Sequence, residues 1–164
     1  RPVAAQEAGG TAAPAAAPAA GPKSSPQALA DYAKAANFQN NNAFDLALEY
    51  AKTREQGGSP IIRHQSVKGR LFEMYRKVEA ARALNRRCIH TNAVSMPPRL
   101  ELAVASKVTS TQSAFEVASE ALQIFGASGL SREYPIEKIM RDARASMIED
   151  GCNEVLGLVG ATRL

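Results

Sequence analysis

The most regular pattern in this chain is an apolar stripe near its middle. Apolar and small residues recur there at alternating steps of four and three, over about six helical turns. The stripe is formed by Val104, Val108, Thr111, Phe115, Ala118, Leu122 and Phe125. These steps place all of its members on one face of an α-helix, and a face that long must be covered by other helices. The stripe therefore predicts a core helix of a helical bundle in preference to a ligand groove.

The segment 27–56 also favours a helix, with one weak point inside it. Three consecutive asparagines, Asn40–Asn42, favour a break or a cap because Asn side chains compete with the helix for backbone hydrogen bonds. We therefore expect a helix from about residue 42 to residue 56, ended by Gly57–Pro60. The apolar side of that helix would carry Phe44, Leu48 and Ala51.

Three more helices are expected along the chain. The first runs from about His64 to Ile89, the next has Pro135 in its first turn, and a short one follows Gly151. Their apolar positions are Val67, Leu71, Met74, Val78, Ala81 and Cys88, then Ile136, Ile139, Met140, Ala143 and Met147, then Val155, Leu156 and Val159.

These helices with short connections predict an all-α fold, an antiparallel helical bundle of four to five helices. The absence of Trp and the 5% share of aromatic residues agree with an Ala- and Leu-rich helical core, and no convincing strand is visible. We expect the bundle to occupy residues 27–164. Residues 1–26 are Ala/Pro-rich and of low complexity, which predicts a linker or an insertion, because repeated prolines break helices. Arg1 in place of Met suggests a fragment or a processed chain.

Charge and cysteine content narrow the class of protein. The net charge is +4, but acidic and basic residues alternate along the helices, which is typical of a solvated helix surface and does not favour nucleic acid. No apolar run approaches the roughly 20 residues of a membrane helix. Cys88 and Cys152 lack the C-x-x-C spacing, which favours free thiols in a reducing compartment. His64 and His90 lack ligand spacing, so no metal is expected.

Few residues suggest chemistry by themselves. Glu149 and Asp150 are expected at a helix end beside Gly151, where a partly desolvated carboxylate could act as a general base. A pair of solvated carboxylates is the alternative. Arg54, near a Gly-Gly turn, could bind an anion or serve as a surface charge at a helix end. No phosphate-binding loop, dinucleotide fingerprint or Ser/His/Asp set is visible.

Several short sequence motifs, in a fixed order over about residues 43–161, resemble those of a known protein family. They are Tyr50 to Gln56, His64-Gln65, Gln123 to Ala127, Arg132 to Glu137, Met140 to Ala143, and Asp150 to Glu154. Together they resemble the C-terminal helical domain of the acyl-CoA dehydrogenases, flavoenzymes that oxidise acyl-CoA thioesters to enoyl-CoAs.

The resemblance implies a set of FAD-binding residues. Arg54 matches an Arg that contacts the pyrophosphate of an FAD bound mainly by a neighbouring subunit, and Gln56 matches the Gln that follows it in the family motif. Gln65 corresponds to a Gln of the flavin site. The backbone of a family turn that lines the FAD adenosine corresponds to Gln123, Ile124, Phe125, Gly126 and Ala127.

The resemblance also implies a catalytic base. Asp150 stands where the family commonly has a Glu that removes the α-proton of the thioester while the flavin N5 accepts the β-hydride. Gly151 takes a substrate-contacting position, and Cys152 and Glu154 take cofactor-contacting positions. Some family members that act on cyclic acyl-CoA substrates resemble this chain in using Asp, so Asp150 points to an unusual substrate or a 1,4-type oxidation.

The chain also departs from the family pattern. Gly57 replaces an aromatic residue, Ala127 a second glycine, Glu149 an aromatic residue and Cys152 a flavin-contacting Thr, which Cys matches only weakly as a hydrogen-bonding group. The N-terminal helical domain and the middle β-domain, which hold much of the flavin and the acyl chain in the family, are missing from this sequence.

Three hypotheses follow. The leading one is the C-terminal part or subunit of a FAD-dependent acyl-CoA dehydrogenase. Its partners would be acyl-CoA, further copies or a chain supplying the missing domains, and an electron-transfer flavoprotein. The second is a non-catalytic assembly module that oligomerises and completes a partner's FAD site, and the third is a helical bundle with an interaction tail. The resemblance implies a bacterial cytoplasmic or mitochondrial matrix location, without membrane insertion.

Overall fold

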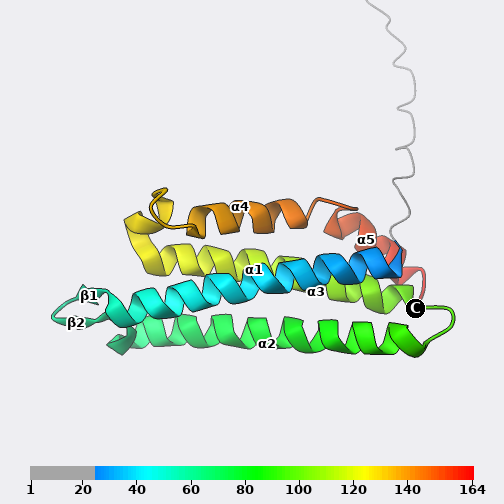
Figure 1. The fold of residues 1–164 in the computed structure, drawn as a ribbon, viewed down its shortest axis with the longest axis horizontal. Coiled ribbons are helices and arrows are strands. Elements are labelled where there is room, and N and C mark those ends of the chain that lie inside the picture. Colours follow the sequence, from blue (N-terminus) through cyan, green and yellow to red (C-terminus); the bar gives the residue numbers. More distant parts are fainter. Residues whose placement is uncertain (1–24) are drawn as a thin grey trace, which may run out of the picture.

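The computed structural model describes residues 25–164 as a bundle of long helices (Figure 1). Helices α1 (Pro26–Thr53), α2 (Gln65–Val94) and α3 (Leu100–Phe125) lie lengthwise beside one another, and successive helices run in opposite directions. The shorter α4 (Ile136–Ser146) and α5 (Asn153–Ala161) follow one another along α3. Helix α3 contacts all four other helices, as the long apolar stripe predicts. The predicted all-α antiparallel bundle is confirmed.

Helix α1 is continuous, so the predicted break at the asparagine run is wrong. The helix begins at Pro26, where the Ser25 side chain accepts a hydrogen bond from the backbone N–H of Ala28 at 3.1 Å. Asn40 is buried and donates to the hydroxyl of Ser113 at 2.9 Å. Asn41 accepts a hydrogen bond from Arg82 at 2.8 Å. Because other helices bind these amides, the side chains no longer compete with the α1 backbone.

A small hairpin replaces the last turn expected for that helix. Helix α1 ends at Thr53, and β1 (Glu55–Gln56) pairs antiparallel with β2 (Ser59–Pro60). The two residues between them, Gly57 and Gly58, have φ angles of 64° and 78°, which glycine adopts most readily. A 3-10 turn, η1 (Ile61–Arg63), then leads into α2. The expectation of no strand is therefore corrected by this two-residue ladder.

The other helix boundaries shift by a few residues. Helix α2 continues five residues beyond the expected end, to Val94. Pro135 is the residue before α4 and not part of its first turn, and a 3-10 turn, η2 (Gly126–Leu130), precedes it. In α5 only Leu156 of the three expected apolar positions is buried, whereas Val155 and Val159 are exposed. The predicted linker falls almost wholly on residues 1–24, outside the described residues.

The core divides into two apolar clusters. The larger one joins α1, α2, α3 and α4, and alanines dominate where α1 meets α3. The smaller one lies toward the start of α3 and contains Leu29, Cys88, Ala103, Val104 and Leu156. Buried polar residues lie between the two clusters on α2 and α3, namely Asn85, Ser106 and Ser110, and on α1 Asn37 and Asn40 lie just inside the larger cluster, after Ala36. Because the residues at the contact of α1 with α3 are mostly small, the backbones of these two helices can lie close together.

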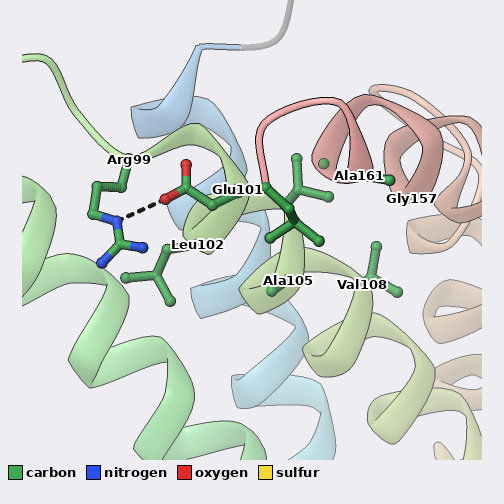
Figure 2. Close-up of a pocket in the computed structure, with 10 residues that line it drawn as sticks. Arg99, Glu101, Leu102, Ala105, Val108, Gly157 and Ala161 are labelled. Atoms are coloured by element: carbon green, nitrogen blue, oxygen red, sulfur yellow. Dashed lines mark hydrogen bonds and ion pairs between the residues drawn. The ribbon is translucent and has the colours of Figure 1, made fainter.

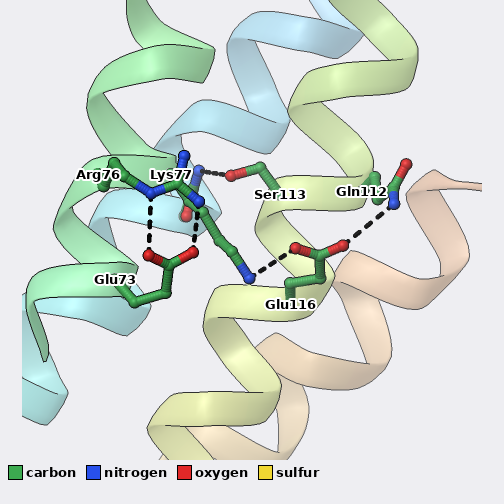
Figure 3. A network of polar contacts seen from close by, with 7 residues as sticks. Glu73, Arg76, Lys77, Gln112, Ser113 and Glu116 are labelled. Atoms are coloured by element: carbon green, nitrogen blue, oxygen red, sulfur yellow. Dashed lines mark hydrogen bonds and ion pairs between the residues drawn. The ribbon is translucent and has the colours of Figure 1, made fainter. Parts of the chain in front are cut away.

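Charged side chains pair along the surface between α2 and α3 (Figure 3). The ammonium of Lys77 lies 2.7 Å from a carboxylate oxygen of Glu116, and Gln112 donates to the same carboxylate at 3.1 Å. The hydrogen bond from Lys77 holds the pKa of Glu116 below its usual value. Arg76 binds Glu73 one turn away on α2. No helix within residues 25–164 is long and apolar enough to cross a membrane.

Candidate functional site

Most of the predicted cofactor residues lie at one end of the bundle. The hairpin that follows α1, the start of α2 and the end of α3 meet there (Figure 1). They form an open pocket of about 440 Å³, lined by Gln56, Gly57, Ile61, His64, Ser66, Val67, Arg70, Gln123 and Ile124. A ring nitrogen of His64, Nε2, lies 3.0 Å from the carbonyl oxygen of Gln56, which ties the hairpin to α2. Segments about 60 residues apart in the sequence thus share one pocket.

Not every predicted cofactor residue lines this pocket. Arg54 and Gln65 are exposed next to lining segments, Arg54 at the end of α1 and Gln65 as the first residue of α2. The backbone carbonyl of Arg54 accepts a hydrogen bond from the N–H of Ile61 at 2.8 Å, which fixes the base of the hairpin. Arg54 therefore belongs to an anchored piece of backbone next to the pocket, although it does not line the pocket itself.

The turn after α3 is held by aromatic rings. Phe125 is buried, stacks on Tyr50 with ring centroids 4.1 Å apart, and meets the edge of Tyr134 at 5.0 Å. Gly126 then ends α3 with a φ of 62°. Because Phe125 faces the core, a ligand at this turn would meet backbone atoms, the exposed Gln123, Gly126 and Ala127, and the part of Ile124 that lines the pocket. The backbone-lined contact with the FAD adenosine stays a prediction.

The residues of this pocket suit a ligand such as FAD in their chemistry. Amide groups from Gln56 and Gln123 and the imidazole of His64 offer directional hydrogen bonds. The guanidinium of Arg70 is a planar cation suited to phosphate oxygens, but it is paired with Glu120 in the structure and would have to share or leave that partner. A Cβ added to Gly57 would lie 3.7 Å from the His64 ring, at van der Waals contact and without a clash. Because Gly57 has a φ of 64°, a larger side chain at this position would nevertheless strain the backbone of the hairpin.

The predicted base lies elsewhere, in the loop between α4 and α5. Helix α4 ends at Ser146, so the expectation that Asp150 sits at a helix end is wrong: it is four residues beyond, in a turn. Asp150 has a φ of 56° and Gly151 a φ of 98°. The left-handed region is uncommon for residues other than glycine, although Asp adopts it more readily than most. A Cβ on Gly151 would lie 3.2 Å from Leu156, so close packing also favours glycine there.

A buried lysine that sequence reasoning missed holds this loop. Lys107 of α3 has no exposed surface, and its ammonium donates to the carbonyl of Gly151 and to the amide oxygen of Asn153, both at 3.0 Å. The Asn153 amide nitrogen donates in turn to the hydroxyl of Thr111 at 3.0 Å. Burial lowers the pKa of Lys107, and the nearby Cys152 and Asp150 act in the opposite direction.

A signal for Lys107 was present in the sequence. Lys107 precedes Thr111 by four residues, and Thr111 belongs to the apolar stripe, so the two lie on the same helix face. A lysine on the buried face of a core helix needs partners, because an unpaired buried charge is costly. Of the two remaining predicted residues, Cys152 caps the start of α5 and is half-buried, and Glu154 is exposed in its first turn.

A second pocket lies between α3 and α5 and has a different character (Figure 2). It has a volume of about 400 Å³ and is lined mostly by apolar and small residues, including Leu102, Ala105 and Val108. Its polar rim is the ion pair of Arg99 and Glu101, whose atoms lie 2.7 Å apart. None of the predicted site residues lines it.

The two predicted groups are thus separated along the bundle. The turn of residues 123–127 precedes α4 and the Asp150 loop follows it, so the 11 residues of α4 set them roughly 16 Å apart along the helix axis. The structure brings Gln56, Gln123 and Ile124 together, and it brings Asp150, Gly151 and Cys152 together in the other group.

Comparisons with known proteins agree with this architecture. Residues 33–164 match the family model described as the C-terminal domain of acyl-CoA dehydrogenase. The chain is 40% identical over 109 residues to a short-chain-specific acyl-CoA dehydrogenase of Megasphaera elsdenii, covering 66% of this chain and 28% of that protein. It is also 40% identical over 114 residues to a 3-sulfinopropanoyl-CoA desulfinase of Paraburkholderia xenovorans, covering 70% of this chain and 29% of that protein.

Solved structures give the same result. The butyryl-CoA dehydrogenase of Megasphaera elsdenii superposes with a TM-score of 0.77 at 33% identity, over 84% of this chain and 36% of that one. A chain in a structure described as the electron transferring flavoprotein of Acidaminococcus fermentans superposes with a TM-score of 0.79 at 32% identity, over 83% of this chain and 36% of that one. The chain thus spans less than a third of the curated relatives it matches.

Proposed function

Because the chain belongs to the acyl-CoA dehydrogenase family and matches its C-terminal domain, we propose that it is the C-terminal part of a FAD-dependent enzyme that oxidises an acyl-CoA thioester to the enoyl-CoA. The remaining domains would be supplied by the rest of a longer protein or by a partner chain. The observation that carries the proposal is the Asp150–Gly151 turn, where a carboxylate in an uncommon backbone conformation stands on a loop bound from inside the bundle.

Asp150 would act as the base in this proposal. Its carboxylate would take the α-proton of the thioester, and Gly151 beside it would let the substrate approach the backbone closely. Bound FAD would supply the hydride acceptor. An Asp side chain reaches one methylene less far than Glu, so the substrate must lie closer to the loop. That requirement favours a compact or cyclic acyl group or a 1,4-type oxidation.

The pocket at the other end of the bundle would hold the cofactor's adenosine and pyrophosphate. Gln56, His64 and Gln123 line it with hydrogen-bonding groups, and the guanidinium of Arg54, two residues before Gln56, would reach the pyrophosphate. Gln65, next to His64, would contribute toward the flavin, as would Cys152 and Glu154 at the start of α5. Since α4 separates the two groups, one chain would serve two cofactor molecules in an oligomer, or two distant parts of one cofactor.

The alternative is a non-catalytic assembly module that oligomerises and completes a partner's FAD site. The substitutions at Gly57, Ala127 and Glu149 favour it, because they remove family features around the cofactor and the base. The relative in Paraburkholderia xenovorans is named a desulfinase, so a C-terminal domain this similar also occurs in a protein whose name is not that of a dehydrogenase.

The test compares Asp150→Asn with wild type in the enzyme completed by the missing domains. We expect kcat for acyl-CoA oxidation to fall by about 10²–10⁴-fold, the usual contribution of a general base, with flavin absorbance per subunit unchanged. Glu149→Gln is the matched control, because it removes the neighbouring carboxylate, and it should keep most of the activity. Full activity in Asp150→Asn would contradict the proposal and leave the assembly module as the better hypothesis.

A further inference from the structure

Lys107 is a buried cation that the proposed reaction does not itself use. Its side chain is the largest among the fully buried ones of the described residues, and it comes from the first third of the central helix α3. A lysine that only stabilised the bundle could be replaced by an apolar residue, because buried charges rarely outperform good apolar packing. What Lys107 binds therefore indicates why a charge stands there.

Lys107 holds two points of the loop that carries Asp150. The carbonyl of Gly151 directly follows Asp150 in the chain, and the amide oxygen of Asn153 belongs to the first residue of α5. Thr111, one turn along α3, binds the same Asn153 amide, and its hydroxyl donates to the Lys107 carbonyl at 2.9 Å. The loop is thus fastened to two successive turns of a rigid helix.

The rest of the loop depends on this attachment. The N–H of Asn153 donates to the carbonyl of Met147 at 3.0 Å, which closes the turn around Asp150. Asp150 itself is held with a φ of 56°, a conformation that persists when its surroundings enforce it. Without the ammonium, the carbonyl of Gly151 would lose its described partner, and the turn could relax toward ordinary backbone angles.

We propose that Lys107 is the positioning residue of the base: its ammonium fixes the Gly151 carbonyl and the Asn153 side chain, and thereby the left-handed turn that presents Asp150 to the substrate. The inference rests on the proposed function for the role of Asp150, but the fastening of the loop is testable without it. Lys107 does not touch the reacting atoms and acts through the backbone of residues 150–153.

The first measurement is amide hydrogen exchange on the chain itself, for wild type, Lys107→Met and Lys77→Met. Met is similar in length to Lys but carries no charge. Lys77→Met is the control, because it removes a partly buried lysine of α2 that pairs with Glu116 of α3, away from the loop. We expect amides of residues 147–153 to exchange about 10-fold faster or more in Lys107→Met, since a hydrogen bond to a charged group is lost. Lys77→Met should leave them unchanged.

A purely structural lysine would give a different result. Exchange would then rise across the whole bundle in Lys107→Met, or the loop would keep its wild-type rate, and either result would overturn the inference. If Lys107→Met loses its helical circular dichroism, Lys107→Gln, which keeps a polar donor, takes its place. Its amide exchange is then compared between the loop and helices α1 to α3 in the same way.

The second measurement is kinetic, in the completed enzyme. We expect Lys107→Met to lower kcat by about 10–100-fold, because a base displaced by about 1 Å loses that much, with KM and flavin content close to wild type. Suppose that residues 147–153 exchange faster in Lys107→Met but Asp150→Asn is fully active. That result would refute the proposed function, while the inference that Lys107 holds the loop would stand. An inactive Asp150→Asn together with an unaltered Lys107→Met would refute the positioning role alone.

Discussion

At the scale of the residue, the ionisation of Lys107 makes the stability of the fold depend on pH in a defined direction. Burial lowers its pKa in the folded protein below the ordinary value of 10.5, while the unfolded chain keeps that value. Between the two pKa values the unfolded chain binds more protons, so the free energy of unfolding must rise as the pH rises through this window. The groups that oppose the shift are Cys152, Asp150, Glu149 and Glu154.

The expected result is a difference between wild type and Lys107→Met. The free energy of unfolding of wild type, minus that of Lys107→Met, should rise by at most about 1.4 kcal/mol per pH unit up to about pH 10.5. The limit follows because unfolding takes up one proton at Lys107 in this range. Urea unfolding of both proteins at a series of alkaline pH values measures this, and the subtraction removes titration of the other lysines and tyrosines. A difference that is flat with pH would show that Lys107 ionises normally.

The same residue shows how far single positions can be predicted from the sequence. Asp150 is found from its place in a string of family-like residues, although its left-handed conformation is not visible there. For Lys107 the sequence shows only that it shares a helix face with Thr111, and it does not show which groups the lysine binds. Its partners, Gly151 and Asn153, lie more than 40 residues away, and only the packing of α5 on α3 brings them together.

At the scale of the element, the turn after α3 depends on one glycine. A Cβ on Gly129 would lie 2.8 Å from the carbonyl oxygen of Leu122 and 2.9 Å from Phe125, closer than such atoms approach. We expect Gly129→Ala to destabilise the protein by about 1–3 kcal/mol, the usual cost of overpacking. Gly69→Ala is the matched control, since Gly69 lies in α2 with nothing within 4 Å, and it should stabilise by about 0.5–1 kcal/mol. Chemical denaturation of both variants checks the pair, and equal effects would contradict the close approach.

Helix α1 shows why elements are predicted better than their interruptions. The periodic apolar positions identify each long helix, because a buried face needs little more than spacing. The asparagines of α1 argue locally for a break, yet Ser113 and Arg82 bind two of them from other helices. Tertiary partners therefore reverse a local preference that is correct for an isolated segment. The Gly-Gly turn is likewise closed into a hairpin by the hydrogen bond from the N–H of Ile61 to the carbonyl of Arg54, which the sequence pattern does not show.

At the scale of the whole molecule, the separation of the two groups by α4 leads to a complementation experiment. If Arg54 serves a neighbour's cofactor and Asp150 serves the subunit's own site, a mixed oligomer of Arg54→Ala and Asp150→Asn subunits contains an intact site. In that site the base comes from the first subunit and the arginine from the second. We expect mixed oligomers of the completed enzyme, isolated through two different tags, to oxidise acyl-CoA although neither parent does so well.

The controls for this experiment are the two single-variant oligomers and a mixture with the double variant. A wild-type and double-variant mixed dimer would place one lesion in each of its sites, so it should be less active than its share of wild-type chains suggests. Mixed oligomers as inactive as the parents would contradict the shared arrangement. Sequence resemblance implies the sharing, and the distance along α4 adds the physical reason to test it.

The ring cluster behind the hairpin end of the bundle also gives the molecule an optical property. The chain has four tyrosines and no tryptophan, so its ultraviolet emission comes from phenol rings alone. Tyr50 stacks at 4.1 Å on Phe125, and Tyr134 meets the same ring edge-on at 5.0 Å, directly behind the turn that ends α3. A ligand that absorbs where tyrosine emits and that binds on that turn would therefore quench the emission of Tyr50 and Tyr134 by energy transfer. Intrinsic tyrosine fluorescence would thus report ligand binding at this end of the bundle without an added label.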